Sequence, residues 1–545
     1  MNITIAGKSA KLRGQGMNGA VGSDYVMDVR RDRLVITASA LGTVFEWYDF
    51  YIYGVLAPII GRTFFPTDNP TVELLYTLAG FAIGFAFRPI GAALFGYLGD
   101  RLGRKYTFLA TIILMGVATA GVGLTPSAAS IGIAAPIILI VLRIAQGLAL
   151  GGEYGGAAIY VAEHAPPGRR GFYTSFIQAG VIGGFILSLI VVVGTQAIVG
   201  PDIWADWGWR LPFIFSLALL GISLWMRLML RESPVFTAMK KAGAQSKNPI
   251  KEAFTYPGNR KRMLVAMIGI AAGFTVIAYT VMFQALYFLQ NGLHVSPGIA
   301  QLLVGGSAFA GMAAFVYFGH LSDRVGRKKP IVIGYALVLL LLMPLYQFLG
   351  ATANPALVEA GARSPVVVRG PDCVFDPFAK VQPTACGKLL DHFSKRGIPY
   401  DKLAAPAPAV QIGDLQVTDL SSDGLDAALK AGGYPSGAVT PDWPRAMMLF
   451  GALLLLWTLS GATYGPVAAL LSEYFPARIR YSSLSIPYHI GTGYFGGFLP
   501  LVSQYIVART GDPYAGLWYT LAVVALALIT CLVALPETKD RPLDA

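Results

Sequence analysis

Long apolar blocks separated by short polar segments make up most of this chain. The blocks 106–124, 172–199 and 331–349 contain no charged residue at all. About 20 apolar residues in a helix, rising 1.5 Å each, cross the ~30 Å hydrocarbon core of a bilayer. Each block is therefore long enough to form a membrane-spanning helix.

Twelve such blocks predict an all-α polytopic membrane protein, built from two halves of six helices. The predicted helices cover 34–60, 72–98, 106–124, 131–161, 172–198, 210–230, 263–290, 298–321, 331–350, 445–471, 482–508 and 514–535. The predicted divisions are an N-terminal segment 1–33, a first bundle 34–230, a linker 231–262, helices seven to nine in 263–350, an insertion 351–443, helices ten to twelve in 444–535 and a tail 536–545.

Charge composition and placement agree with this topology. Only 13% of residues are charged, whereas about a quarter are charged in typical soluble proteins. The formal net charge is +12, and most of the 42 Lys and Arg lie in the N-terminal segment, the tail and every second loop. Because Lys and Arg resist translocation, these segments and both termini are expected in the cytoplasm, beside membrane lipid. The basic residues therefore do not indicate nucleic-acid binding. The first 33 residues do not have the pattern of a cleavable signal peptide.

An internal repeat supports the two halves. The sequence LGDRLGRK of Leu98–Lys105 recurs as LSDRVGRK in Leu321–Lys328. A second match aligns the E…P…R pattern of Glu163–Arg170 with Glu473–Arg480. The two copies of the E…P…R pattern are farther apart than the two copies of the charged loop by roughly 87 residues. The second half therefore contains an insertion, which lies between helices nine and ten.

The insertion 351–443 is polar and is expected outside the cytoplasm, as a small subdomain with a disordered part at the Ala/Pro run Leu403–Val410. It contains Cys373 and Cys386, two of the three cysteines. In an oxidising compartment they form either a disulfide or two free thiols, and the sequence leaves both alternatives open.

The pattern in Gly96–Lys105, repeated after helix eight, resembles the signature of the major facilitator superfamily. The RIAQG of Arg143–Gly147 and the run Gly42–Gly54, together with Phe87–Gly91 and Gly151–Gly156, look like its metabolite:proton symporter family. Members carry 2-oxoglutarate, shikimate, citrate, proline and betaine. The resemblance implies a bacterial inner-membrane protein and gating roles for the charged residues of both loops, namely Asp100, Arg101, Arg104, Asp323, Arg324 and Arg327.

Four ionisable residues are expected near the middle of the membrane, where unpaired charges are costly and therefore mark function. They are Glu46, Asp49, Arg88 and Arg143. A static network of ion pairs is the structural alternative to a role in coupling or binding. Arginine stays protonated, so the proton carrier is expected to be Asp49 or, second, Glu46, with Arg143 assisting in coupling.

Arg88 and Arg143 are expected to bind a substrate carboxylate. Further substrate-binding residues are expected on helices one, seven and eleven: Trp47, Tyr53, Tyr279, Gln284 and Tyr488. His489 lies on helix eleven too, and a lone membrane histidine is more often a structural hydrogen-bonding residue.

The favoured function is proton-driven import of a small carboxylate by alternating access, with the protein acting as a monomer. The second candidate is a zwitterion such as proline or betaine, with Trp47, Tyr48 and Tyr51 around its ammonium group. The third is a substrate-sensing receptor. No nucleophile–base set, metal-ligand spacing or phosphate loop is present in the sequence, so we expect no enzyme activity, metal or cofactor.

Overall fold

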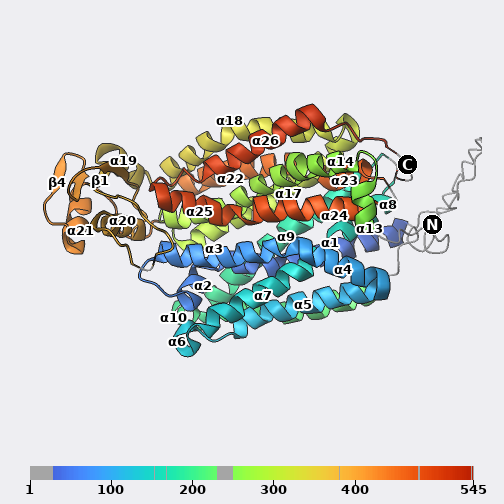
Figure 1. Ribbon diagram of the computed structural model, residues 1–545, viewed down its shortest axis with the longest axis horizontal. Coiled ribbons are helices and arrows are strands. Elements are labelled where there is room, and N and C mark those ends of the chain that lie inside the picture. The colour runs from blue at the N-terminus through green and yellow to red at the C-terminus, as the bar shows by residue number, and fades with distance from the viewer. Residues whose placement is uncertain are drawn as a thin grey trace, which may run out of the picture.

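The computed structural model describes residues 29–229 without 103, 153 and 167, residues 249–541 without 380, 477 and 478, and residue 543. Long helices run side by side along the longest axis of the molecule, and a small unit with strands lies beyond one end of them (Figure 1).

The described part of the first half is helical. Its elements are α1 (Val29–Val55), α2 (Ala57–Phe64), α3 (Pro70–Ala86), α4 (Arg88–Leu102), α5 (Arg104–Leu124), α6 (Ala128–Ile131), α7 (Ala134–Gly151), α8 (Tyr154–His164), α9 (Arg170–Val199), α10 (Pro201–Asp206), the 3-10 turn η1 (Gly208–Arg210) and α11 (Leu211–Met229). The short α13 (Pro249–Thr255) precedes the second half.

The second half contains α-helices interrupted by π-helical turns. Its α-helices are α14 (Asn259–Val265), α15 (Gly273–Tyr279), α16 (Ala285–Tyr287), α17 (Pro297–Val325), α18 (Lys328–Ala353), α22 (Trp443–Tyr464), α23 (Val467–Tyr474), α24 (Arg480–Ile490), α25 (Leu499–Thr510) and α26 (Leu517–Ala534). Its π-helical segments are η2 (Ala266–Ala272), η3 (Thr280–Gln284), η4 (Phe288–Gly292) and η6 (Gly491–Gly497).

Within the described residues, nine helical stretches are long and apolar enough to cross a membrane. The apolar part of α5, Leu109–Leu124, is shorter. The two other predicted spans, 34–60 and 482–508, are occupied by α1 with α2 and by α24 with η6 and α25. A total of twelve crossings therefore stays a prediction.

Several predicted spans are broken where the sequence contains Gly or Pro. α3 ends before Phe87 and α4 follows it, because Pro89 lacks the N–H that a continuous helix would use. Gly152 separates α7 from α8, and Gly465 and Pro466 separate α22 from α23. The predicted start of helix seven at 263 is late, since α14 begins at Asn259, directly after a glycine.

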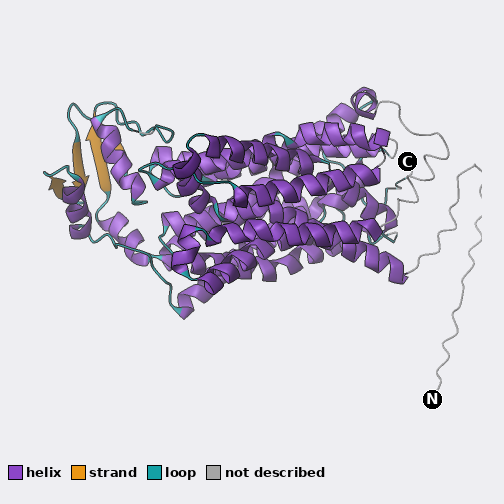
Figure 2. Cartoon of the chain, turned by 90° about the horizontal axis from the view of Figure 1, so that it is seen from below, coloured by secondary structure: helices purple, strands orange, loops and turns teal. Residues whose placement is uncertain are grey.

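The insertion folds as a small α/β unit. Its elements are α19 (Pro355–Arg363), β1 (Val366–Gly370), α20 (Ala385–Lys395), β2 (Asp401–Ala404), β3 (Ala409–Ile412), β4 (Leu415–Val417) and α21 (Ser422–Ala431). The sheet order is β2-β1-β3-β4, with β1 parallel to β2 and antiparallel to β3. Figure 2 shows these strands at one end of the helices, which we call the insertion end. The opposite end, where α17 meets α18, is called the loop end.

The expectation of disorder at Leu403–Val410 is wrong. This run supplies the end of β2 and the start of β3, and both pair with β1. Val410 of the run is fully buried, whereas Leu403 is exposed. Cys373 and Cys386 are joined by a disulfide in the same unit.

Candidate functional site

Aromatic rings fill the centre of the contact between the halves. Tyr51 of α1 and Phe85 of α3 meet Tyr279 of α15 from the other half, with ring centroids 6.2 Å and 5.6 Å apart. Phe283 of η3 lies 5.8 Å from Tyr51. All four side chains are buried. We call Tyr51, Phe85, Tyr279 and Phe283 the central aromatic cluster.

Phenol hydroxyls gather beside this cluster. Tyr464 and Tyr488 of the second half approach each other with their oxygens 3.4 Å apart. The phenol of Tyr51 lies close enough to interact electrostatically with Tyr279, Tyr464 and Tyr488. The sequence analysis selected Tyr279 and Tyr488 for binding but missed Tyr464, which no motif marks.

Arg88 is completely buried at the start of α4. Its guanidinium carbon lies 5.4 Å from the centroid of the Trp47 ring and 5.1 Å from that of Phe85. Among the described residues, none of its three guanidinium nitrogens has a hydrogen-bond acceptor. Aromatic faces attract a cation but do not replace its hydrogen bonds, so this site retains donors for a ligand.

Arg143 is also completely buried but has a polar partner. Its Nη1 donates to Gln146 Oε1 at 2.5 Å, and Gln146 Nε2 donates to Thr119 Oγ1 at 2.8 Å. The guanidinium carbon lies 4.2 Å from the centroid of the Tyr53 ring. The Arg and Gln of the RIAQG sequence are thus one hydrogen-bonded pair on α7.

The two carboxylates of α1 are buried, with 9% of Glu46 and 6% of Asp49 exposed. In the described part of the chain, neither Arg88 nor Arg143 forms an ion pair with a carboxylate. The alternative of a static network among these four residues is therefore not what the structure shows. Tyr53, one turn after Asp49, donates its hydroxyl to Thr77 O at 3.0 Å.

The aromatic rings expected around a substrate ammonium group are only partly brought together. Trp47 and Tyr51 have ring centroids 5.0 Å apart and lie at the centre. Tyr48 is wrong as a third member, because its hydroxyl donates to Pro212 O at 2.6 Å within the first half. Neighbouring residues on a helix point about 100° apart, so Trp47 and Tyr51, four residues apart, share a face that Tyr48 does not.

Two further residues of the second half are buried near these groups. Gln284 accepts a hydrogen bond of 2.8 Å from Gln504 Nε2. His489 has no side-chain hydrogen-bond partner for either ring nitrogen among the described residues.

A network of charges closes the loop end. Asp323 accepts from the backbone N–H groups of Gly171 and Phe172, at 2.7 Å and 2.8 Å, at the start of α9 in the other half. Arg327 lies 2.6 Å from Asp323 and 2.9 Å from Glu473. Asp323 thus caps a helix N-terminus, where a negative charge is stabilising, and pairs with Arg327 at once. Arg324 offers its backbone carbonyl to Lys539 Nζ at 3.0 Å.

The matching loop of the first half contains the other three predicted gating residues. The side chains of Asp100, Arg101 and Arg104 lie outside the described residues.

Two glutamates, Glu473 and Glu537, also belong to the loop-end network, and the sequence analysis used only the first, as a repeat marker. Glu473 also accepts from Thr538 Oγ1 at 3.1 Å. Glu537 accepts from the backbone N–H groups of Arg327, Lys328, Thr538 and Lys539. Burial raises the pKa of Glu537, but these four donors outweigh it and hold the pKa below its usual value.

The halves also touch on the insertion side of the central aromatic cluster. Tyr287 donates its hydroxyl to Gly54 O at 2.7 Å. Together with the loop-end network, this contact closes the centre from both ends.

Glycines allow the helices around Arg88 and Arg143 to pack closely. A Cβ on Gly147 would overlap Gly84 O, and one on Gly151 would overlap Arg88 O. Tight packing is therefore the role of this Gly-rich stretch of α7, as small residues provide in membrane helices.

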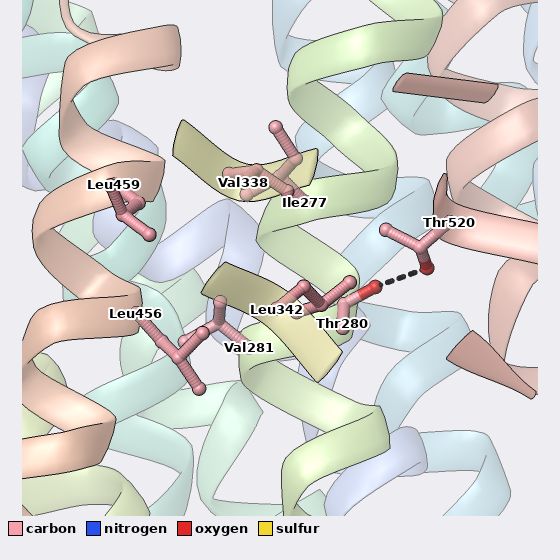
Figure 3. A pocket seen from close by; sticks show the side chains of 8 residues that line it. All are labelled: Ile277, Thr280, Val281, Val338, Leu342, Leu456, Leu459 and Thr520. Atoms are coloured by element: carbon pink, nitrogen blue, oxygen red, sulfur yellow. Dashed lines mark hydrogen bonds between the residues drawn. The ribbon is translucent and has the colours of Figure 1, made fainter. Parts of the chain in front are cut away.

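A pocket lies elsewhere, within the second half. It is a narrow gap between side chains with no room for a ligand, and it is lined by Ile277, Thr280, Val281, Val338, Leu342, Leu456, Leu459 and Thr520. Figure 3 shows aliphatic side chains around it and the hydrogen bond of 2.7 Å between the hydroxyls of Thr280 and Thr520. No charged residue lines it and it does not reach the first half, so it does not provide the transport site.

The known proteins that this chain resembles in sequence are membrane transporters. A family model described as "Sugar (and other) transporter" matches residues 34–263. The inner membrane metabolite transport protein YhjE of Escherichia coli is 32% identical, over 93% of this chain and 95% of that protein. A proline/betaine transporter of Salmonella typhimurium is 29% identical, over 96% of this chain and 87% of that protein.

Other relatives differ in their stated cargo. A shikimate transporter of Escherichia coli is 35% identical, over 60% of this chain and 74% of that protein. The proton:xylose symporter XylE has a structure that superposes with a TM-score of 0.61 at 17% identity, covering 95% of this chain and 98% of that one. This last likeness concerns the fold alone.

Proposed function

Because the chain belongs to the major facilitator superfamily of membrane transporters, we propose that it is a proton symporter that imports a small carboxylate-bearing metabolite. The chain is a multi-pass membrane transporter and not an enzyme. The coupling to protons, the direction of transport and the identity of the substrate are proposed.

One observation carries the proposal for the cargo. Arg88 is fully buried at the contact between the halves, and its guanidinium has no acceptor among the described residues. Leaving a charged donor without a partner costs more than the 1–3 kcal/mol of a neutral group. A substrate carboxylate would supply the missing acceptors in a bidentate arrangement.

Proton transfer is assigned to the first half. Asp49 is the first candidate for the carrier and Glu46 the second, because both carboxylates are buried on one face of α1. The pair of Arg143 and Gln146 is the supporting element, since it fixes a permanent positive charge on the neighbouring α7.

The proposed cycle is alternating access. The loop end faces the cytoplasm and the insertion end faces the opposite side, as the positions of Lys and Arg favour. Opening toward the cytoplasm breaks the hydrogen bonds of Asp323 to the start of α9 and the ion pair of Glu473 with Arg170, 3.6 Å apart. Opening toward the insertion breaks the hydrogen bond of Tyr287.

A zwitterion is the second candidate cargo. Trp47 and Tyr51 stand beside Arg88, so an ammonium group could lie on aromatic faces while the guanidinium holds the carboxylate. The proline/betaine transporters among the relatives support the same choice.

The test is uptake by the purified protein in liposomes with an imposed proton gradient. Labelled shikimate, 2-oxoglutarate, proline and glycine betaine are compared, with choline as a probe that lacks a carboxylate. We expect uptake of at least one acid, abolished by an uncoupler, and none of choline. Binding without any uptake would favour the sensing receptor instead.

The carrier assignment has its own test. Asp49→Asn should abolish gradient-driven accumulation but retain exchange of labelled for unlabelled substrate, since exchange needs no net proton movement. Full accumulation by this variant would contradict the assignment.

A further inference from the structure

His489 is a buried group that the proposed cycle leaves without a role. Its side chain is completely buried on α24, and neither ring nitrogen has a side-chain hydrogen-bond partner among the described residues, the backbone of Gly151 being its polar neighbour. Buried polar groups normally have partners, and one without needs an explanation such as a ligand.

The surroundings of His489 place it opposite Arg88. α24 runs against the first half, where Tyr481 donates its hydroxyl to Gly152 O at 3.3 Å and Ser485 lies against Gly155. One turn after Ser485, the imidazole lies beside the backbone of Gly151 and within electrostatic reach of Arg88. The carbonyl of Arg88 itself packs on Gly151. Because α24 also packs on α4, which begins at Arg88, both Arg88 and His489 lie next to Gly151, one from each half.

We propose that the substrate carboxylate is held between Arg88 of the first half and an imidazole N–H of His489 of the second. This inference rests on the proposed function. A carboxylate has two oxygens and several lone pairs, so it accepts from both groups at once. Without it, closure leaves the buried Arg88 guanidinium without an acceptor, and with it the acceptor is supplied. The substrate thereby stabilises the closed state more than the open states, as a transported ligand must.

The test compares His489→Gln, which keeps an N–H donor, with His489→Leu, which removes it. KM is measured for exchange and for gradient-driven uptake of the acid that the wild-type protein transports. We expect His489→Leu to raise KM at least tenfold in both assays, and His489→Gln to stay within about threefold. His320→Leu serves as the control, because His320 packs on Phe172 near the loop end.

Two results would overturn the inference. One is an unchanged KM for His489→Leu. The other is loss of accumulation with intact exchange in His489→Gln, which would make the histidine a proton relay. If the wild-type protein transports none of the four acids, the proposed function is wrong, and this inference, which depends on it, is wrong too.

A second inference follows independently from the insertion. Both of its ends continue into second-half helices, α18 and α22. Its contacts with that half are numerous: Arg509 Nη1 donates to Phe375 O at 2.8 Å, and Val439 N donates to His294 O at 2.8 Å. The insertion is therefore expected to move with the second half.

The insertion also binds the first half. Asn69 Nδ2 donates to Asp391 Oδ1 at 2.6 Å, and the hydroxyl of Tyr76 donates to Phe378 O at 2.6 Å. The ring of Phe378 lies 5.8 Å from Tyr76 of the first half and 5.8 Å from Tyr505 of the second. The unit thus spans the line along which the halves must separate.

We infer that the insertion is a strap across the insertion end, which must release Asn69 and Tyr76 whenever the protein opens on that side. The strap adds to the closure that Tyr287 provides nearer the centre. Its release therefore forms part of the step that admits substrate.

Pairs of cysteines linked by a short bifunctional reagent test this inference. Asn69→Cys with Asp391→Cys joins the strap to the first half, and Phe378→Cys with Tyr505→Cys joins it to the second. We expect linkage of the first pair to lower uptake at least tenfold, and linkage of the second to leave more than half. Equal effects of the two linkages would overturn the inference.

Spin labels on the same pairs give a readout that needs no substrate. In lipid nanodiscs, the 69–391 distance should show a second, longer population, whereas the 378–505 distance should stay single. A single short distance for 69–391 under all conditions would also overturn the inference, without bearing on the proposed function.

Discussion

Tyr287 of the second half donates its hydroxyl to the backbone carbonyl of Gly54 in the first half, at 2.7 Å. Both residues are buried, and the ring of Phe283 lies directly against Gly54. This hydrogen bond therefore exists only while the insertion side of the centre is closed.

Tyr287→Phe removes that hydrogen bond and leaves the ring in place. We expect the closed form to lose about 1 kcal/mol relative to the form open at the insertion end, roughly a fivefold shift in population. Spin-label distances across the insertion end measure this population. The control is Tyr519→Phe, whose hydroxyl bonds to Phe495 O within the second half and should not shift it.

Gly147→Ala should destabilise the first half. Its Cβ would overlap the carbonyl oxygen of Gly84, so α3 and α7 must separate. Overpacking of this kind costs about 1–3 kcal/mol. Thermal unfolding in detergent should show a lower Tm, whereas Gly194→Ala, with nothing within 4 Å of its Cβ, should not. Equal Tm values for the two variants would contradict the close packing.

Glu473→Gln should loosen the loop end. The carboxylate is buried and pairs with Arg327, and removing one partner of a buried ion pair costs about 3–5 kcal/mol. Faster hydrogen exchange is expected at the amides of Gly171 and Phe172, which donate to the neighbouring Asp323. Glu359→Gln, on the exposed surface of the insertion, is the control, and slow exchange in both variants would refute the prediction.

Replacing Cys373 and Cys386 by serine should destabilise the insertion alone. Their disulfide closes a loop over a sequence separation of 13 residues, and loops of about this size contribute about 3 kcal/mol. Strands β1 and β3 should lose protection from hydrogen exchange while α17 and α22 keep theirs. Unchanged protection of the strands would show that the sheet does not depend on the bond.

The insertion should also lose stability in acid. Burial and the nearby Arg396 hold the pKa of His392 below its usual 6.5, with Asp426 acting in the opposite direction. The folded unit thus binds a proton less readily than the unfolded one, so stability is complete above about pH 6.5 and falls below it. Limited proteolysis at pH 7.5 and 5.5 should show this loss, and His392→Gln should reduce the difference. Equal cleavage at pH 7.5 and pH 5.5 would contradict the predicted loss of stability in acid.

The helices were predictable because their signal is spread over some twenty residues each. The charged loop was predictable because it occurs twice, and at Asp323 and Arg327 the structure brings its residues together. The fold of the insertion was not predictable, because its strands are only three to five residues long and Leu403–Val410 has a composition typical of disorder.

The sequence predicted which residues form the candidate site better than it predicted the contacts between them. Arg88 and Arg143 stood out because charge is rare in apolar helices. Their contacts did not, since nothing in the sequence places the Trp47 ring beside Arg88 or pairs Gln146 with Arg143. Tyr48 was placed wrongly because adjacency in sequence is not adjacency on a helix, and Tyr464 was missed because its partner Tyr488 lies 24 residues away.

The π-helical turns give the two halves different mechanical characters. In the described residues they occur only in the second half, at η2, η3 and η4 in the stretch 259–292 and at η6 before α25. A π-turn has one residue more than the α-helix needs, and a helix can shorten or lengthen by moving that residue along its axis. The first half, which holds the four central charges Glu46, Asp49, Arg88 and Arg143, is thus expected to be the stiffer one. The cycle would be divided between a rigid half that binds and a compliant half that bends, so duplication has been followed by mechanical specialisation.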